Sequence, residues 1–170
     1  AVLLEEPENH LSHSNMKKLI EEVIKSTGKQ IFVATHSDLI STRLDLRKSI
    51  LLNSSTKNRI KLADLPEDTS KFFIKAPDNN ILEFILSDKV ILVEGDAEFI
   101  LLEALYTKKM KKSLVENNIH VISVGGTSFP RYLDLAVLLN IKTAVITDND
   151  KKYEENITNR YSKYDMSNIG

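Results

Sequence analysis

The chain is 170 residues long, carries 23 lysines and arginines against 24 aspartates and glutamates, and has a net charge of −1. With 42% hydrophobic and 28% charged residues it has a globular composition, enough for one domain or for one domain and part of another. The balanced charge excludes non-specific binding to DNA through overall charge, and the lack of cysteine excludes disulfides and thiolate metal sites. Because no apolar run reaches the ~18 residues of a membrane span, we expect a soluble, cytoplasmic protein without a membrane partner.

The first part of the chain alternates short apolar strands with an amphipathic helix, which Gly28 ends. Residues 66–80 hold two prolines and several turn formers, which predicts a linker. The expected elements before this linker are strands at 2–4 and 31–34, a helix at 15–26, and a hairpin formed by 49–53 and 59–65.

A second series of alternating strands and helices follows the linker and predicts an α/β fold with a mainly parallel sheet. After residue 150 the apolar pattern fades into a polar stretch that predicts a loop. The expected elements of this second part are strands at 89–93, 120–124 and 143–147, and helices at 97–114 and 129–139.

Acidic residues follow the first strand, and a histidine follows the second. In nucleotide hydrolases the first acid of a pair such as Glu5–Glu6 holds Mg²⁺, and the second orients the attacking water. A histidine at a strand end, here His36, can touch the γ-phosphate. The alternative is that the acids are solvated and match the dipole of a helix start. Because the chain has no glycine-rich phosphate-binding loop, we expect the later part of an ATPase lobe whose phosphate-binding part lies outside it.

Four further carboxylates stand at the ends of the later strands. Glu94 and Glu98 follow the strand at 89–93, and Asp148 and Asp150 follow the strand at 143–147. In a parallel sheet these ends share one edge, where open α/β folds bind ligands. Two like charges ~6 Å apart repel by about 3 kcal/mol, so such a cluster must bind protons or cations. Oxygen ligands alone favour Mg²⁺, Mn²⁺ or Ca²⁺; the alternative is separate, solvated strand-end and capping roles.

These motifs resemble known families. Glu5–Glu6 resemble the Walker B pair of ATP-binding-cassette ATPases of the chromosome-maintenance and DNA-repair kind, residues 8–12 their D-loop, and His36 their switch histidine. The segments VEGDAE at 93–98 and TDND at 147–150 resemble the topoisomerase–primase (Toprim) fold. A Toprim domain that follows a cassette ATPase in the chain is the arrangement of the OLD (overcoming lysogenisation defect) family of ATP-dependent endonucleases. The segment VGGTSF at 124–129 is similar to that family as well.

The resemblance implies a fragment of an ABC-type ATPase lobe followed by a Toprim, Rossmann-like domain. The implied limits are 1–65 for the ATPase part, 66–87 for a linker and connecting helix, and 88–170 for an incomplete Toprim domain. The implied function is ATP-dependent, metal-dependent DNA cleavage, in phage defence or DNA repair. The implied partners are DNA, ATP, further copies of the protein bound through the ATPase lobe, and a helicase-like or other defence protein.

The resemblance also assigns roles to single residues. Glu94 would be a metal ligand or general base, and two Mg²⁺ or Mn²⁺ ions would support phosphodiester hydrolysis. In the ATPase half, ATP with Mg²⁺ would bind at Glu5, Glu6 and His36, with Glu6 as the catalytic residue. The other implied residues are the metal ligands Glu98, Asp148 and Asp150, and the glycines that let backbone approach a metal or phosphate, Gly95 and Gly126.

Two other functions are compatible with part of the sequence. Haloacid-dehalogenase-like phosphohydrolases also place D-x-D after a strand, but Lys151 and Lys152 follow here in place of the usual Gly-Thr, and VEGDAE goes unexplained. A non-catalytic, Toprim-like module that binds nucleic acid or supports assembly is the second alternative. Metal binding near Asp148 separates it from a nuclease.

Overall fold

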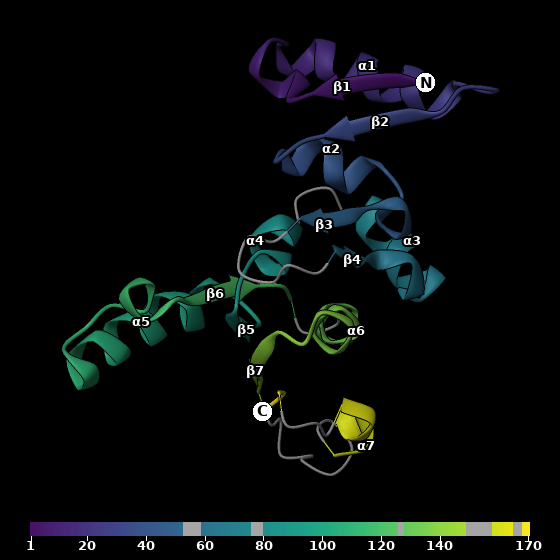
Figure 1. Ribbon diagram of the computed structural model, residues 1–170. Helices are drawn as coiled ribbons and strands as arrows, with labels where there is room; N and C mark the ends of the chain where they lie inside the picture. The colour runs from purple at the N-terminus through teal and green to yellow at the C-terminus, as the bar shows by residue number, and fades with distance from the viewer. Residues whose placement is uncertain (53–58, 76–79, 126–127, 149–157, 165–167) are drawn as a thin grey trace. The chain divides into compact units, whose positions relative to one another are not determined.

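The computed structural model of the chain describes residues 1–52, 59–75, 80–125, 128–148, 158–164 and 168–170. The chain divides into two compact units, Ala1–Leu82 and Glu83–Gly170, and each is described by itself. Their helices and strands can be followed by label in Figure 1. Among the described residues, no helix is both long and apolar enough to cross a membrane.

The first unit begins with two parallel strands joined by a helix. Strand β1 (Val2–Glu5) pairs with β2 (Ile31–Ala34), and α1 (His13–Lys25) connects them. The Ser12 hydroxyl caps α1 by accepting a hydrogen bond from the Asn15 backbone N–H at 3.4 Å. After α1, Gly28 turns the chain with a φ of 68°, a conformation that favours glycine. The predicted order of strand, helix and strand is confirmed.

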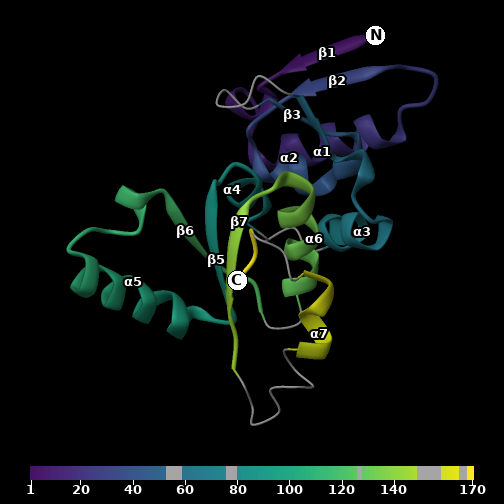
Figure 2. The ribbon, with the colours of Figure 1, turned by 60° about the horizontal axis from the view of Figure 1, so that its bottom comes forward.

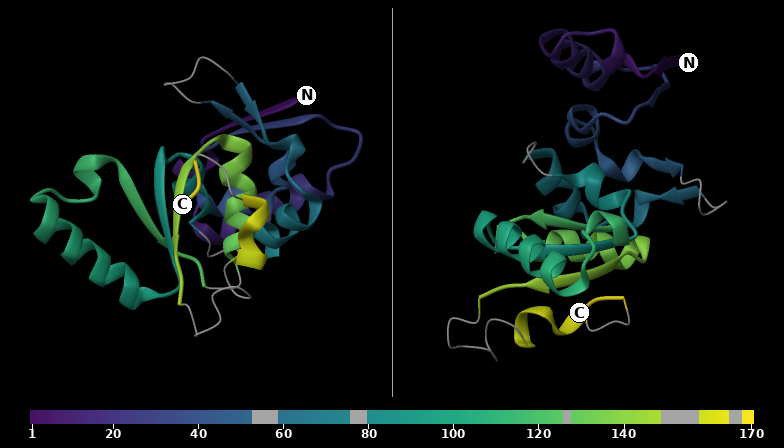
Figure 3. Two further views of the ribbon diagram at one scale, coloured as in Figure 1. Left: turned by 90° about the horizontal axis from the view of Figure 1, so that it is seen from below. Right: turned by 90° about the vertical axis from the view of Figure 1, so that its left-hand side faces the viewer.

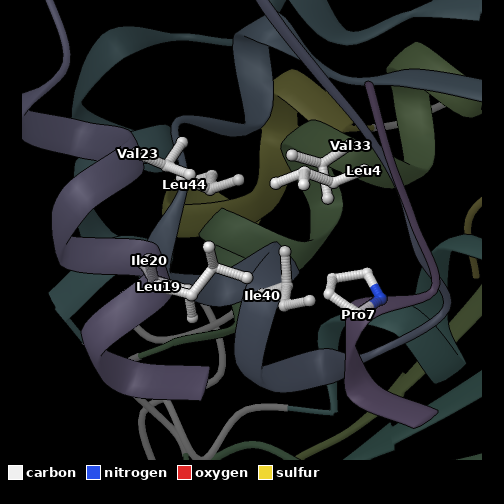
Figure 4. Close-up of a pocket in the computed structure, with 8 residues that line it drawn as sticks. All are labelled: Leu4, Pro7, Leu19, Ile20, Val23, Val33, Ile40 and Leu44. Atoms are coloured by element: carbon white, nitrogen blue, oxygen red, sulfur yellow. The ribbon is translucent and has the colours of Figure 1, made fainter. Parts of the chain in front are cut away.

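The apolar side of this strand pair packs against α1 and the short helix α2 (Asp38–Arg43), which the sequence pattern did not predict. Met16, Ile20 and Ile40 form the buried centre of this core. Figure 4 shows a small pocket here, lined by apolar residues only: Leu4, Pro7, Leu19, Ile20, Val23, Val33, Ile40 and Leu44. Because no polar group lines it, the pocket is an imperfection of core packing and offers nothing to orient a polar ligand.

The predicted hairpin is present, but the predicted linker is partly wrong. Strands β3 (Ile50–Leu52) and β4 (Arg59–Lys61) pair antiparallel. The helix that follows them in the chain, α3 (Glu67–Lys75), begins directly after Pro66, and Phe73 on this helix is completely buried. The turn formers Pro66, Glu67 and Asp68 are therefore the start of a helix, where proline and acids are favoured.

A half-buried ion pair stabilises the 3-10 turn of residues Leu46–Lys48 in the first unit. The Arg47 side chain donates two hydrogen bonds to the Asp45 carboxylate, at 3.1 and 2.9 Å, and the Arg47 backbone N–H donates another at 3.1 Å. The Ser70 hydroxyl donates a fourth at 2.8 Å. Hydrogen bonding to Arg47 is the main cause that lowers the pKa of Asp45 to about 2. The depressed pKa means that the ionised carboxylate stabilises the folded state.

We expect Asp45→Asn to lower the free energy of unfolding by about 2 kcal/mol at pH 7. Because the pKa of Asp45 is depressed in the folded state, its contribution is complete above pH ~5 and disappears as the pH falls towards 2. Urea unfolding of the two proteins at pH 7 and pH 2 measures this. The matched control is Asp64→Asn, an exposed acid nearby, which should change little at either pH. A difference between Asp45→Asn and wild type that is equal at both pH values would contradict the argument.

The second unit contains a three-stranded parallel sheet in the order β6–β5–β7. After α4 (Ile81–Ile85), which crosses the division between the units, come β5 (Lys89–Val93), β6 (Ile119–Ser123) and β7 (Lys142–Ile146). Helix α5 (Asp96–Met110) connects β5 to β6, and α6 (Phe129–Leu139) connects β6 to β7. The prediction of an α/β fold with mainly parallel sheets is confirmed.

The two connecting helices lie on opposite faces of this sheet, as Figures 2 and 3 show. The chain moves from β5 to β6 in one direction and then crosses back over β5 to β7, so two right-handed connections must use different faces. Helix α6 carries the buried residues of one face, Phe129, Tyr132, Leu133, Leu135 and Ala136. Helix α5 buries none of its residues and leaves Ile100, Leu101 and Leu105 exposed.

Two predictions about the second unit need correction. Helix α5 ends at Met110 and not at residue 114, because Lys111 takes a left-handed conformation with a φ of 57°. The polar stretch after residue 150 is not all loop: it contains α7 (Asn159–Tyr161) and a 3-10 turn at Ser162–Tyr164 with Tyr164 buried. Residues 168–170 then run parallel to β7, where the Thr143 N–H donates to the Asn168 carbonyl at 2.8 Å.

Candidate functional site

Glu94 directly follows β5, at the edge of the second sheet where the loops after β5 and β6 diverge. The loops that leave β5 and β6 lead to helices on opposite faces, which makes their carboxyl ends the switch point where open α/β sheets bind ligands. The Glu94 carbonyl accepts hydrogen bonds from the Gly125 N–H at 3.1 Å and the Ser123 hydroxyl at 3.4 Å. Its carboxylate accepts a hydrogen bond from the Thr147 hydroxyl, directly after β7. Glu94 therefore ties the ends of all three strands together.

Glu98 serves the start of helix α5. Its carboxylate accepts a hydrogen bond from the Gly95 N–H at 3.1 Å, which is the half of a capping box that the N3 residue supplies. A Cβ on Gly95 would come within 3.3 Å of that carboxylate, so the Glu98 side chain would have to shift by a few tenths of an ångström to accept a larger residue here. The role of Gly95 in approaching a metal or phosphate stays a prediction.

Asp148 lies at the same edge of the sheet as Glu94. Val93 is paired with Ile146 in the register of β5 and β7, so the residues just past these strands, Glu94 and Thr147, are neighbours, and Asp148 follows. Asp148 is exposed, while Asp150 and Gly126 lie outside the described residues. Within the described part of the chain, no group of three acidic or histidine side chains is arranged to hold a metal ion. Convergence of all four carboxylates thus stays a prediction.

The first unit brings two of its three predicted residues close together. Glu6 follows β1 with a left-handed backbone, at φ 40° and ψ 54°, which costs a non-glycine residue about 1–2 kcal/mol. Its N–H donates to the Ala34 carbonyl at 2.8 Å, which ties it to the end of β2. The His36 Nδ1 then lies 3.6 Å from the Glu6 carboxylate. Glu5, the last residue of β1, is exposed next to them.

Glu8 holds the segment that carries His36. Its carboxylate accepts hydrogen bonds from the Thr35 hydroxyl at 2.6 Å and the His36 N–H at 3.0 Å, and lies 3.4 Å from the His36 Nδ1. Partial burial favours a higher pKa of Glu8, but the hydrogen bonds from Thr35 and His36 outweigh it and lower the pKa below its usual value. The carboxylate is therefore the ionised acceptor around which this loop is arranged.

The sequence analysis placed Glu8 in the D-loop-like segment and Thr147 in the TDND motif, but it gave no contact or role of their own to Glu8, Thr147 or Thr35. Thr147 directly precedes the D-x-D motif, and Thr35 directly precedes His36, so proximity to a motif was the available signal. Their contacts cross between strand ends that are distant in the chain, and a sequence pattern does not show which hydroxyl meets which carboxylate.

Comparison with family models matches a Toprim model to the later part of the chain and an AAA model to its first part. Residues 85–150 match the model described as "Overcoming lysogenization defect protein-like, TOPRIM domain". Residues 1–42 match the model described as "AAA domain, putative AbiEii toxin, Type IV TA system". The chain has the ATPase–Toprim architecture of the OLD family. The match to the Toprim model covers β5, β6, β7 and Glu94, and the match to the AAA model covers β1, β2 and His36.

Two curated relatives match most of this chain. The chain is 30% identical over 152 residues to Endonuclease GajA of Bacillus cereus (strain VD045), a match that covers 88% of this chain and 26% of that protein. It is 23% identical over 160 residues to Old nuclease of Escherichia phage P2, which covers 88% of this chain and 27% of that protein. The chain therefore spans about a quarter of the length of these relatives, both of which are nucleases by name.

Proposed function

We propose that the protein containing this chain is an ATP-dependent, divalent-metal-dependent DNA endonuclease. The Toprim region would cleave phosphodiester bonds, and the ATPase region would regulate cleavage. The observation that carries the proposal is the position of Glu94, at the switch point of the Toprim sheet and in hydrogen-bond contact with Thr147, next to Asp148. The nuclease names of both relatives support it.

The donor set at this edge fits Mg²⁺ or Mn²⁺. Glu94 and Asp148 offer carboxylate oxygens there, the sequence adds Asp150 two residues later, and the chain has no cysteine to favour a softer metal. In the proposal these three residues hold the cations, and Glu98 joins them only if it leaves the Gly95 N–H. Bound divalent cations lower the pKa of a metal-bound water and stabilise charge on the leaving oxygen. The Glu94 carboxylate would be held in place for this by the Thr147 hydroxyl.

The ATPase part of the proposal rests on the ends of β1 and β2. Glu5 would hold the Mg²⁺ of ATP, Glu6 would orient the attacking water, and His36 would contact the γ-phosphate. The 3.6 Å between the Glu6 carboxylate and His36 Nδ1 supports a shared task for these two residues. A lysine and backbone N–H groups for the phosphates would come from another part of the protein, because the chain has no Gly-x-x-x-x-Gly-Lys motif.

Metal removal tests the proposed cleavage. We expect the full-length protein to nick or linearise supercoiled plasmid with Mg²⁺ or Mn²⁺, to lose this activity in EDTA, and to regain it when Mn²⁺ is added in excess. The products are measured on agarose gels after fixed times. Cleavage that continues unchanged in EDTA would contradict the metal-dependent site. A protein that binds DNA but never cleaves it, with or without ATP, would favour the non-catalytic module.

A further inference from the structure

Glu8 has more contacts to the segment after β2 than the predicted ATPase residues have. One oxygen of its carboxylate, Oε1, accepts from the Thr35 hydroxyl at 2.6 Å and from the His36 N–H at 3.0 Å. The same oxygen lies 3.4 Å from the His36 Nδ1. The Thr35 hydroxyl in turn accepts from the Ser37 N–H at 3.0 Å. These contacts connect the turn after β1 to three successive residues after β2.

The arrangement comes at an energetic cost that folding alone does not explain. The Glu8 side chain is only 14% exposed, and its second oxygen, Oε2, is buried with no hydrogen-bond partner among the described residues. A buried, charged and half-satisfied carboxylate is unfavourable compared with an apolar residue of similar size. Such groups are retained where they hold another group in place, and here the groups held are the Thr35 hydroxyl and the His36 backbone N–H.

His36 depends on this carboxylate for its orientation. Its side chain is 66% exposed, so packing does not hold the imidazole ring. The groups near its Nδ1 are the carboxylates of Glu8, at 3.4 Å, and of Glu6, at 3.6 Å. With Nδ1 directed at these carboxylates, the opposite nitrogen, Nε2, is left to meet a ligand.

We propose that Glu8 is a positioning residue of the ATPase half-site, which acts through His36. It fixes the loop after β2 by hydrogen bonds to Thr35 and His36 and orients the imidazole so that Nε2 can contact the γ-phosphate of ATP. This inference rests on the proposed ATPase function of His36. It adds a residue that touches neither ATP nor metal. It also predicts that Glu8 acts on catalysis only through His36, so the losses caused by replacing the two residues are not additive.

A double-mutant cycle on ATP hydrolysis by the full-length protein tests this. We expect Glu8→Ala and His36→Ala each to lower kcat by at least about tenfold, with KM for ATP changed less than about threefold. The double variant should be no slower than His36→Ala alone, because Glu8 acts only through the histidine. Glu22→Gln, an exposed acid on α1, is the matched control and should keep wild-type turnover.

Thr35 gives a second test that keeps the Glu8 carboxylate. Thr35→Val removes the hydroxyl that donates to Glu8, and Thr35→Ser retains it. The valine variant should lower kcat, and the serine variant should stay within about threefold of wild type. The comparison of these two variants tests the positioning role of Glu8 even if Glu8→Ala fails to fold, which circular dichroism would show.

Other outcomes separate the two proposals. Independent, multiplicative losses from Glu8→Ala and His36→Ala would overturn the positioning role but leave the ATPase function intact. The same holds if His36→Ala hydrolyses ATP normally while Glu6→Gln does not. If neither Glu6→Gln nor His36→Ala lowers ATP hydrolysis, the proposed ATPase site is wrong, and the role of Glu8 falls with it.

Discussion

Replacing Glu94 by alanine is expected to lower DNA cleavage by the full-length protein at least about a hundredfold. Glu94 presents its carboxylate at the switch point of the sheet, and the Thr147 hydroxyl holds it there. Alanine removes a charge that would hold a cation and leaves the backbone hydrogen bonds of this position, to Gly125 and Ser123, intact. The loss should therefore appear in cleavage, measured as the initial rate of plasmid nicking with Mn²⁺, and not in folding.

The matched control for Glu94 lies at the other end of the same strand. Asp88 is an exposed acid just before β5, at the opposite edge of the sheet, and Asp88→Asn should cleave at the wild-type rate. Thr147→Val should have an intermediate effect, because it leaves the Glu94 charge but removes its hydroxyl partner. Undiminished cleavage by Glu94→Ala would show that the nuclease site is elsewhere.

Glu6→Gln is expected to lower ATP hydrolysis by the full-length protein about a hundredfold or more while ATP still binds. Glutamine has the same shape and tolerates the left-handed backbone as glutamate does, so the variant changes the charge with little change in fold. Its side-chain oxygen can still accept the hydrogen bond that the Asn9 amide donates at 2.7 Å. A glutamine cannot orient a water as a base does, so the rate of ATP hydrolysis should fall while ATP binding is retained.

Phosphate release and binding of a fluorescent ATP analogue measure the two properties separately. Glu21→Gln, an exposed acid on α1 that pairs only weakly with Lys25 at 3.8 Å, is the control and should change neither. Loss of ATP binding equal to the loss of hydrolysis would mean that Glu6 holds the nucleotide and does not act in the chemical step.

The strands of the fold were predictable because their apolar runs are short, regular and bounded by turn formers. The predicted strand at 31–34 and helix at 129–139 match β2 and α6 residue for residue. Helices α2 and α3 were missed, since one is short and the other starts with residues that also form turns. The predicted domain limits stay a prediction, although the division of the chain at Leu82 falls inside the predicted linker and connecting helix.

The site was predictable in its main residues and not in their contacts. Strand-end acids at Glu94 and Glu6 follow from local sequence alone, because parallel strands must present their carboxyl ends at one edge. The contact of Glu94 with Thr147 spans 53 positions, and that of Glu8 with Thr35 spans 27. Such contacts depend on strand order and register, which local patterns leave open.

The amino-acid sequence by itself determined the α/β class, the position of the strands, and the motifs that place this chain in the OLD architecture. These properties depend on side-chain periodicity and on residue types at fixed spacing, and both are local. Only the tertiary structure decided that β7 lies beside β5, that Glu98 turns back to cap its helix, and that Glu8 holds the His36 loop. These features depend on packing and hydrogen bonds between segments that are distant in the sequence, so no single segment determines them.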